Sequence, residues 1–374
     1  MALFLALSLA LNVVVNPLRL FPSPLSIDAL DEYREISGRM RTGKAGLIRS
    51  ESDWDVCVFG SSRVGHGFDP LDGVWGGKKT VNLGMSGGFL TETIPMIHYA
   101  LCRSKPRCVV IGVDPGDLTS DHDGRQGSDF YLSPLAGEVG QLNRELSYVF
   151  GVKTTELSFK ALRNAAQSKP AKYTPQGFSC ETSARKRKQS QLEFIQSQFT
   201  PESKALFEQN GIRASKRDSL EQALNVARAD GRRVVVIYLP MHALNHAQTS
   251  HLGFHKAPFE HERRVLLEIT EATGAELWDF HTYSSAAQEP LVAGVGNTMK
   301  SWTDLGHFTS EMGTIMLEQI MGVGDERGQI LGGRLSPERM DQHLQQVAQQ
   351  YQHYLQTQGT RDVQMKEERQ KKPF

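Results

Sequence analysis

The chain has 374 residues, of which 39% are hydrophobic and 22% are charged, so it is long enough to bury a sizeable core. Its 42 Lys and Arg residues balance its 42 Asp and Glu residues. This balance, and the lack of an interleaved basic and aromatic motif, argue against a nucleic-acid partner.

The N-terminal segment is uncharged. The run Ala2 to Val15 (ALFLALSLALNVVV) contains only two polar residues and ends before Asn16, Pro17 and Arg19. It is shorter than the roughly 20 residues that cross a bilayer, and no basic region precedes it. We expect residues 1–20 to be a signal-anchor or export segment, with an unusual signal peptide or a buried amphipathic helix as alternatives. The first interpretation places the rest of the chain outside the cytoplasm, attached to the cell membrane by a single pass or exported.

Strand-like and helix-like segments alternate along most of the remaining chain. Apolar runs of this kind, without polar interruptions, are typical of strands that are buried on both faces. We therefore expect an α/β fold with a doubly wound, flavodoxin-like parallel sheet and helices on both faces, formed by residues 50–118 and 218–325. The predicted strands are 55–59, 80–83, 108–113, 233–239 and 276–280, and the predicted helices are 91–102, 219–231, 261–273 and 309–321.

Two further segments have different compositions. Residues 119–217 lack strand signals and predict a helical insertion, whose later part is basic and includes Arg185-Lys-Arg-Lys188. Two interpretations of this basic part stay open: a solvated surface, or a positive patch that attracts an anionic polymer or lipid headgroups. Residues 334–374 are rich in Gln and then charged, which predicts a solvated helix and a disordered tail.

Cysteine and histidine usage indicates neither a metal nor a cofactor. The four cysteines contain no CxxC pair, although their spacing permits a disulfide between Cys102 and Cys108. Five histidines lie between His242 and His261, but no Glu separates an i, i+4 pair as in HExxH, and Pro and Gly interrupt the segment. We expect an exposed loop there, in which His242 is the residue best suited to touch a substrate.

Polar and glycine-rich blocks follow the predicted strands. The carboxyl ends of parallel strands share one edge of a sheet, so these blocks should meet there. A serine in a glycine-started turn directly after a strand can present both its hydroxyl and its own amide to such a crevice. The blocks are Gly60 to Arg63, Asn82 to Gly88, Gly112 to Asp117 and, before the last predicted helix, Trp302 to Phe308.

These blocks resemble the SGNH/GDSL hydrolase family, which has Gly-Asp-Ser after its first strand, a glycine block, Gly-x-Asn and a closing Asp-x-x-His. Asn82-Leu-Gly84 and Asp304-Leu-Gly-His307 match the second and last of these. The first block reads Gly60-Ser-Ser62, as in the branch of D-alanyl-lipoteichoic-acid esterases and related membrane-anchored envelope proteins. The resemblance covers about residues 52–118 and 232–322.

The resemblance implies a serine-dependent mechanism. Ser62 would be the nucleophile, His307 its general base and Asp304 the group that orients His307, while Asp279 is a competing candidate for this last role. Arg63, Asp114 and His242 would contact the substrate.

The resemblance also implies an oxyanion hole, which this sequence matches in part. The amides of Ser62 and Gly84 would supply two donors. The third donor of the family, an Asn side chain, falls on Asp114, whose ionised carboxylate cannot donate a hydrogen bond. Either Asn82 or Arg63 would have to substitute for it, or the enzyme is slow or inactive.

The implied function is ester hydrolysis or O-acyl transfer on an extracytoplasmic polysaccharide or another cell-envelope polymer. The expected partner is then a carbohydrate polymer or acylated glycan, and no cofactor is needed. The absent Asn motivates an alternative: a catalytically degenerate SGNH-fold protein that binds carbohydrate or assists assembly beside an integral membrane acyltransferase.

Overall fold

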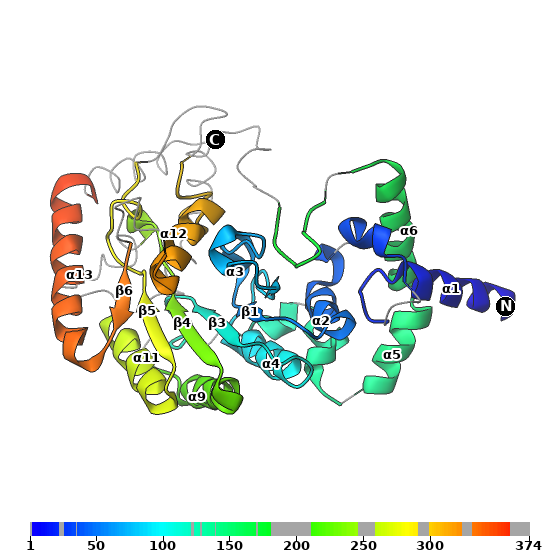
Figure 1. Cartoon of the computed structure of the whole chain (residues 1–374), viewed down its shortest axis with the longest axis horizontal. Helices are drawn as coiled ribbons and strands as arrows, with labels where there is room; N and C mark the ends of the chain where they lie inside the picture. The colour runs from blue at the N-terminus through cyan, green and yellow to red at the C-terminus, as the bar shows by residue number, and fades with distance from the viewer. Residues whose placement is uncertain are drawn as a thin grey trace, which may run out of the picture.

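The protein is a mixed α/β structure built on a six-stranded, mostly parallel sheet with the strand order β2-β1-β3-β4-β5-β6 (Figure 1). The strands are β1 (Val56–Phe59), β2 (Thr80–Asn82), β3 (Cys108–Val113), β4 (Arg233–Tyr238), β5 (Glu276–Asp279) and β6 (Gly333–Leu335). The computed structural model describes residues 2–21, 26–34, 36–120, 123–127, 129–138, 140–169, 171–180, 211–245, 259–290, 299–323 and 331–359.

Helices cover both faces of the sheet because successive strand residues point to opposite sides. Cys57 and Phe59 belong to the larger apolar core, together with residues of α2, α4, α9, α11 and α13. Val56 and Val58 belong to the second core, together with residues of α3 and α12. These helices are α2 (Met40–Ser50), α3 (Ser62–Gly67), α4 (Leu90–Leu101), α9 (Ala214–Arg228), α11 (Glu260–Thr273), α12 (Ser310–Met321) and α13 (Met340–Tyr354).

The five predicted strands and four predicted helices all occur, with small shifts of their ends. Helix α4 begins at Leu90, one residue before the predicted start, and α9 begins at Ala214, five residues before the expected Ser219. Helices α11 and α12 end at Gly274 and Gly322, which adopt the left-handed conformation that favours glycine at this position.

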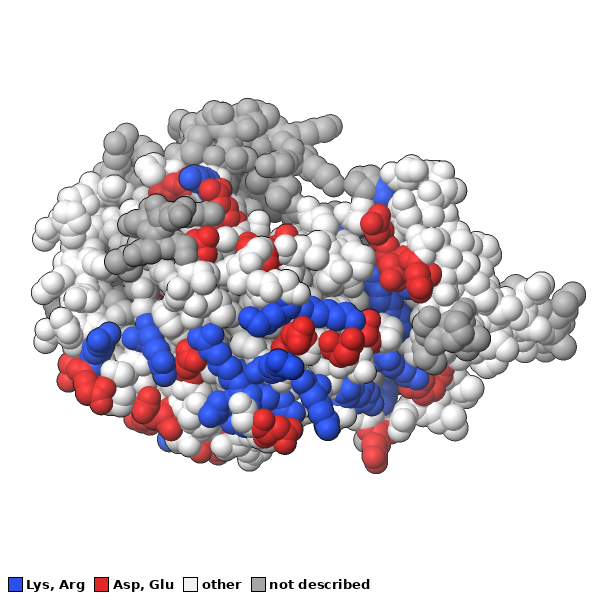
Figure 2. Space-filling view, viewed as in Figure 1, with Lys and Arg blue, Asp and Glu red and all other residues white. Residues whose placement is uncertain are grey.

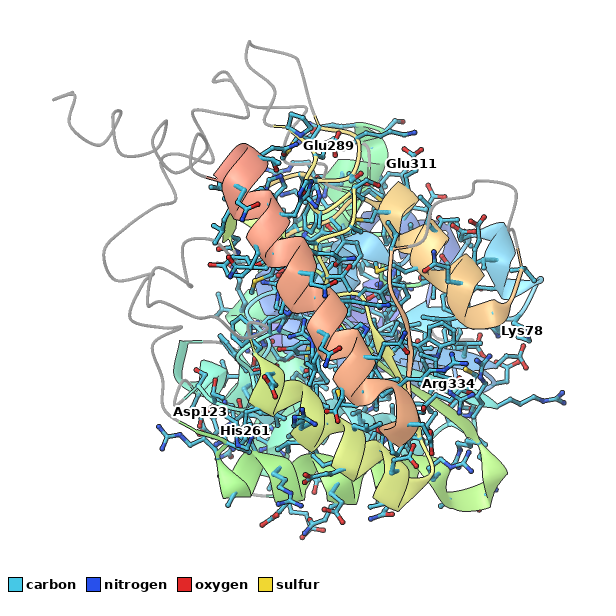
Figure 3. The ribbon with its side chains drawn as sticks, turned by 90° about the vertical axis from the view of Figure 1, so that its left-hand side faces the viewer. Lys78, Asp123, His261, Glu289, Glu311 and Arg334 are labelled. Atoms are coloured by element: carbon cyan, nitrogen blue, oxygen red, sulfur yellow. The ribbon has the colours of Figure 1, made fainter. Side chains whose placement is uncertain are left out.

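The C-terminal segment differs from its prediction. Residues 333–335 form the antiparallel edge strand β6, and α13 packs into the core instead of lying in solvent. Figure 3 shows α13 crossing one side of the molecule. Between the Gln residues, apolar residues recur every three or four positions, which places them on one face of a helix. Its buried members are Met340, Leu344, Val347, Tyr351 and Tyr354.

The N-terminal segment and part of the insertion form a separate cluster of helices. Helix α1 (Ala2–Val15) contacts α5 (Gln141–Phe150) and α6 (Val152–Ala166), which also contact each other (Figure 1). None of the described helices is long and apolar enough to cross a membrane. The four cysteines are free thiols, so the disulfide that the sequence permits between Cys102 and Cys108 is absent.

Candidate active site

The turn after β1 places Ser62 at the carboxyl end of the parallel strands. Gly60 has a φ of +150°, and a Cβ at this position would come within 2.5 Å of a Val64 methyl and 3.0 Å of the Gly112 carbonyl. Only glycine fits this turn. Ser61 caps α3, because its hydroxyl accepts a hydrogen bond of 3.2 Å from the Arg63 amide. Ser62 is therefore the first residue of α3.

Three of the predicted residues lie together at this turn. The Ser62 Oγ is 2.7 Å from the His307 Nε2, and the His307 Nδ1 is 2.9 Å from each carboxylate oxygen of Asp304. With the proton on Nδ1, the imidazole donates to Asp304 and accepts from the Ser62 hydroxyl. The side chain of His307 keeps 32% of its surface exposed, so this end of the arrangement is open to a substrate.

A network of hydrogen bonds fixes the loop that carries Asp304 and His307. The Asp304 Oδ1 accepts from the amides of Gly306 and His307, both at 2.8 Å. The Thr303 amide donates to the His307 carbonyl at 2.9 Å, and the Trp302 indole donates to the Ala286 carbonyl at 2.7 Å. Asp304 and His307 are thus held in one tight loop before α12.

Close packing of α3 against α12 sets the distance between Ser62 and His307. A Cβ at Gly67, the last residue of α3, would lie 1.9 Å from the ring of Phe308. A Cβ at Gly313 would lie 1.8 Å from the Gly67 carbonyl oxygen. Since neither position has room for a side chain, the two glycines allow Phe308 and its neighbour His307 to approach α3.

The environment of Asp304 keeps it ionised. Burial alone would raise the pKa of this carboxyl. The hydrogen bond and charge of His307, with the amides of Gly306 and His307, outweigh burial and lower the pKa of Asp304 to about 2. An ionised carboxylate is what stabilises the imidazolium that forms when a histidine takes a proton. Asp279, the competing candidate, is instead fully buried and paired with Arg263 at 2.6 Å.

Comparison with family models, with curated proteins and with solved structures found no match.

Two expected oxyanion donors are occupied by other partners. The Gly84 amide donates to the Asn82 Oδ1 at 2.9 Å, and this pair is buried. The Asn82 Nδ2 donates to the carbonyls of Val64 and Phe68, each at 2.8 Å. The prediction that Gly84 and Asn82 stabilise an oxyanion is therefore wrong. Through these two hydrogen bonds, the Asn82 side chain connects the end of β2 to α3.

One donor at the site stays unpaired within the described part of the chain. The Ser62 amide is the first of α3 and has no hydrogen-bond partner there.

Arg63 and Asp114 form an ion pair beside the catalytic loop. The Arg63 Nε is 3.2 Å from the Asp114 Oδ1, and both side chains are largely buried. A Cβ on Gly306 would lie 3.6 Å from the Arg63 Nη2, so the guanidinium lies against the Asp304 loop. The Arg63 Nη1 and the Asp114 Oδ1 are buried without a hydrogen-bond partner among the described residues. The Asp114 Oδ1 is therefore held by the charge of Arg63 alone, and the Arg63 Nη1 is the donor left without a partner in this part of the structure.

A buried network that the sequence analysis missed positions Asp114. The carboxylate of Glu262 on α11 accepts from the amides of Gly116 and Leu118 at 2.8 and 2.9 Å and from the Tyr238 hydroxyl at 2.5 Å. Burial raises the pKa of Glu262, while these hydrogen bonds oppose the rise. Glu262 thus fixes the loop that follows β3. In the sequence it resembled any charged residue of an amphipathic helix.

The described end of the insertion supports the same region. The Ser179 amide donates to the Gly65 carbonyl of α3, and the Asn82 amide donates to the Gln176 carbonyl, both at 2.9 Å. Lys44, fully buried on α2, donates to the carbonyls of Asn82 and Gly177. Burial, together with the charge of Arg19, lowers the pKa of Lys44 to about 7. Residues 171–180 therefore brace α3 and β2.

The prediction that His242 contacts the substrate is wrong. His242 is buried, its Nδ1 accepts from the Leu244 amide at 3.1 Å, and its Nε2 lies 2.7 Å from the Glu289 carbonyl. Its own amide donates to the Leu305 carbonyl at 3.1 Å. His242 is therefore a structural residue that supports the loop bearing Asp304 and His307.

The buried imidazole of His242 predicts a loss of stability in acid. Burial lowers its pKa to about 4, although the Glu289 carbonyl opposes this. An unfolded histidine has a pKa near 6.5, so its contribution is complete above about pH 6.5 and is lost as the pH falls toward about 4. Between neutral and acidic pH, the native chain should lose up to about 3 kcal/mol more unfolding free energy than His242→Gln. Urea unfolding of both proteins between pH 7 and pH 4.5 measures this difference. An equal dependence of the unfolding free energy on pH in both proteins would contradict the prediction.

Several predicted features lie outside the described residues. These are Arg185 to Lys188 and His246, His251 and His255. Within the described ranges, no group of three or more His, Cys, Asp or Glu side chains could hold a metal ion.

Proposed function

We propose that the chain is a serine-dependent esterase or O-acyltransferase with the doubly wound fold of the SGNH hydrolases. The observation that carries the proposal is the continuous arrangement of Ser62, His307 and Asp304, with contacts of 2.7 and 2.9 Å. These are the contacts that activate a serine as a nucleophile.

In this mechanism the Ser62 Oγ attacks the carbonyl carbon of an ester while the His307 Nε2 takes the hydroxyl proton. The ester carbonyl oxygen becomes an oxyanion, which the Ser62 amide stabilises. The intermediate collapses to an acyl-serine, and His307 returns the proton to the leaving alcohol. Water, or a hydroxyl of an acceptor, then attacks the acyl-serine while His307 takes its proton, and the bond from the acyl carbon to the Ser62 Oγ breaks as His307 returns the proton to that oxygen. The choice of acceptor separates esterase from acyltransferase, and both use the same three residues.

The proposed substrate is an acyl ester on an extracytoplasmic polysaccharide or another envelope polymer. The resemblance to envelope esterases motivates this class. The pair of Arg63 and Asp114 adds physical support, because the exposed 13% and 18% of these side chains place a guanidinium and a carboxylate, which suit the hydroxyl groups of a sugar, beside the catalytic loop. Residues 1–20 would hold the catalytic part on the outer side of the cell membrane.

Labelling with a fluorophosphonate probe tests the activated serine without a known substrate. We expect labelling of the native chain, none of Ser62→Ala, and undiminished labelling of Ser61→Ala, which removes the neighbouring hydroxyl. Failure of the folded native chain to label would favour the alternative, a non-catalytic carbohydrate-binding or assembly protein beside a membrane acyltransferase. The occupied Gly84 amide and the carboxylate of Asp114 are the observations that favour this alternative.

Arg63 would substitute for the missing Asn amide. Arg63 directly follows the nucleophile in the sequence, and its guanidinium lies against the loop that carries Asp304 and His307. Arg63→Met is expected to lower kcat for p-nitrophenyl acetate by about 100- to 1000-fold with little change in KM, the loss typical of one oxyanion donor. Steady-state kinetics measure this.

The double variant Arg63→Met with Asp114→Asn is the matched control. It removes the unpaired carboxylate that the single variant leaves behind and restores an amide donor at residue 114. We expect it to recover part of the lost kcat. A rise in KM alone in Arg63→Met would mean that Arg63 binds the substrate and does not stabilise the transition state.

A further inference from the structure

Helix α1 has its polar residues on the inside. Ser8 and Asn12 are its only polar residues, and both are buried. The Asn12 Nδ2 donates to the Val149 carbonyl at 2.8 Å and to the Thr155 hydroxyl at 3.0 Å, and its Oδ1 accepts from the Ser158 hydroxyl at 2.8 Å. The exposed residues of the helix are apolar and include Leu5, Leu7, Leu9 and Val14.

The two helices that bind α1 continue this apolar surface. Leu142 on α5, Val152 at the start of α6 and Phe159 on α6 are 72%, 77% and 60% exposed. Figure 2 shows this end of the molecule, at the right, as largely uncharged, whereas charged side chains crowd the lower surface. We call the exposed apolar surface of α1, α5 and α6 the apolar tip; its other members include Leu146, Phe150 and Leu162.

This arrangement is the reverse of a helix that faces water. A surface helix in water normally buries its apolar side and exposes its polar side. Exposed apolar area costs about 25 cal/mol per Å² in water, so the exposed apolar residues on three contacting helices favour a partner that covers them. In a bilayer the preference is reversed, because polar groups must find partners within the protein.

A cationic pocket lies beside the apolar tip. It has a volume of about 170 Å³ and lies between the first 3₁₀ segment, Asp28–Tyr33, and the C-terminal half of α6. Lys160 and Arg163, which line it, directly follow Phe159 and Leu162 of the apolar tip. Its charged lining residues are Arg34, Lys160, Arg163, Lys169 and Lys172, against the single acid Glu32.

We infer that the apolar tip docks into the surface of a membrane that contains anionic lipid, and that the cationic pocket receives the lipid headgroups. Helices that lie in a lipid interface typically carry apolar residues next to basic residues. A second copy of this chain fits less well as the partner, because its own cationic pocket would lie near this one and the two would repel each other. Anionic headgroups supply the opposite charge. The docking includes α5 and α6 and so goes beyond an anchor made of α1 alone.

Flotation of the full chain with lipid vesicles tests this docking. The vesicles are phosphatidylcholine alone or with about a third phosphatidylglycerol. We expect the double variant Leu142→Glu with Leu146→Glu to lose at least about tenfold in partitioning to both kinds. Arg163→Glu with Lys169→Glu should lose about tenfold on the anionic vesicles only. The matched control, Val226→Glu with Leu71→Glu, changes exposed apolar residues outside the apolar tip and should partition like the native chain.

Two results would overturn the inference. The first is native partitioning of the α5 variant, which would leave α1 as a sufficient anchor. The second is a native dimer, measured by size exclusion with light scattering, that the α5 variant converts to a monomer without loss of vesicle binding. Circular dichroism establishes that each variant is folded, and fluorophosphonate labelling in solution separates this inference from the proposed activity, since apolar-tip variants should still label.

Discussion

Ser62→Ala and His307→Ala are each expected to lower kcat for p-nitrophenyl acetate by about 10⁴-fold or more, and the double variant should lose no more than either single one. The reason is the 2.7 Å contact between the Ser62 Oγ and the His307 Nε2. A hydroxyl without its base, or a base without its hydroxyl, contributes almost nothing alone, so the two losses are not additive. Steady-state kinetics of the three variants measure the coupling.

His66→Ala is the control for the histidine. The ring of His66 lies 5.7 Å from that of His307 in an edge arrangement, so the substitution disturbs the same neighbourhood and leaves the Ser62 contact in place. We expect a much smaller loss of kcat from it. Independent, additive losses from Ser62→Ala and His307→Ala would contradict a shared mechanism, and full activity of Ser62→Ala would remove Ser62 as the nucleophile.

The strands and the main site residues could be predicted because local sequence determines them. Apolar runs such as Cys108–Val113 have one stable location, the interior of a sheet, and the residues that follow parallel strands meet at one edge. The position of Ser62 after β1 could be expected on this ground, whereas its pairing with His307 and Asp304 was implied by the resemblance of the blocks to the SGNH/GDSL hydrolases. The edge strand β6 was missed because three residues with only Leu335 buried carry too weak a pattern.

The partners of individual side chains could not be predicted in the same way. Glu262 and Arg263 both looked like surface charges of an amphipathic helix, yet both are buried and bind residues far along the chain. His242 looked exposed because its loop is rich in polar residues, yet packing encloses it. Gly84 carried the expected motif, but its amide is occupied by Asn82. Each outcome depends on tertiary contacts, which periodicity does not encode.

Asp304→Asn is expected to lower kcat by about 10⁴-fold while the chain stays folded. The Asp304 Oδ1 accepts from the amides of Gly306 and His307 at 2.8 Å, so the oxygen of an Asn would remain there. Its NH₂ group would then occupy the place of Oδ2, 2.9 Å from the His307 Nδ1. A donor at that place requires Nδ1 to accept, which moves the ring proton to Nε2, where it faces Ser62 and cannot take a proton from it.

The same substitution separates catalysis from stability. The lowered pKa of Asp304, about 2, means that its carboxylate contributes stability above about pH 4, which is lost as the pH falls toward 2. Asp304→Asn should therefore cost up to about 2 kcal/mol of unfolding free energy at neutral pH, which thermal or urea unfolding measures. Glu311→Gln, an exposed carboxylate on the next helix, is the matched control and should change neither quantity much. A kcat within tenfold of the native value would mean that His307 keeps its tautomer without the Asp304 carboxylate, and Asp304 would then support the loop without taking part in catalysis.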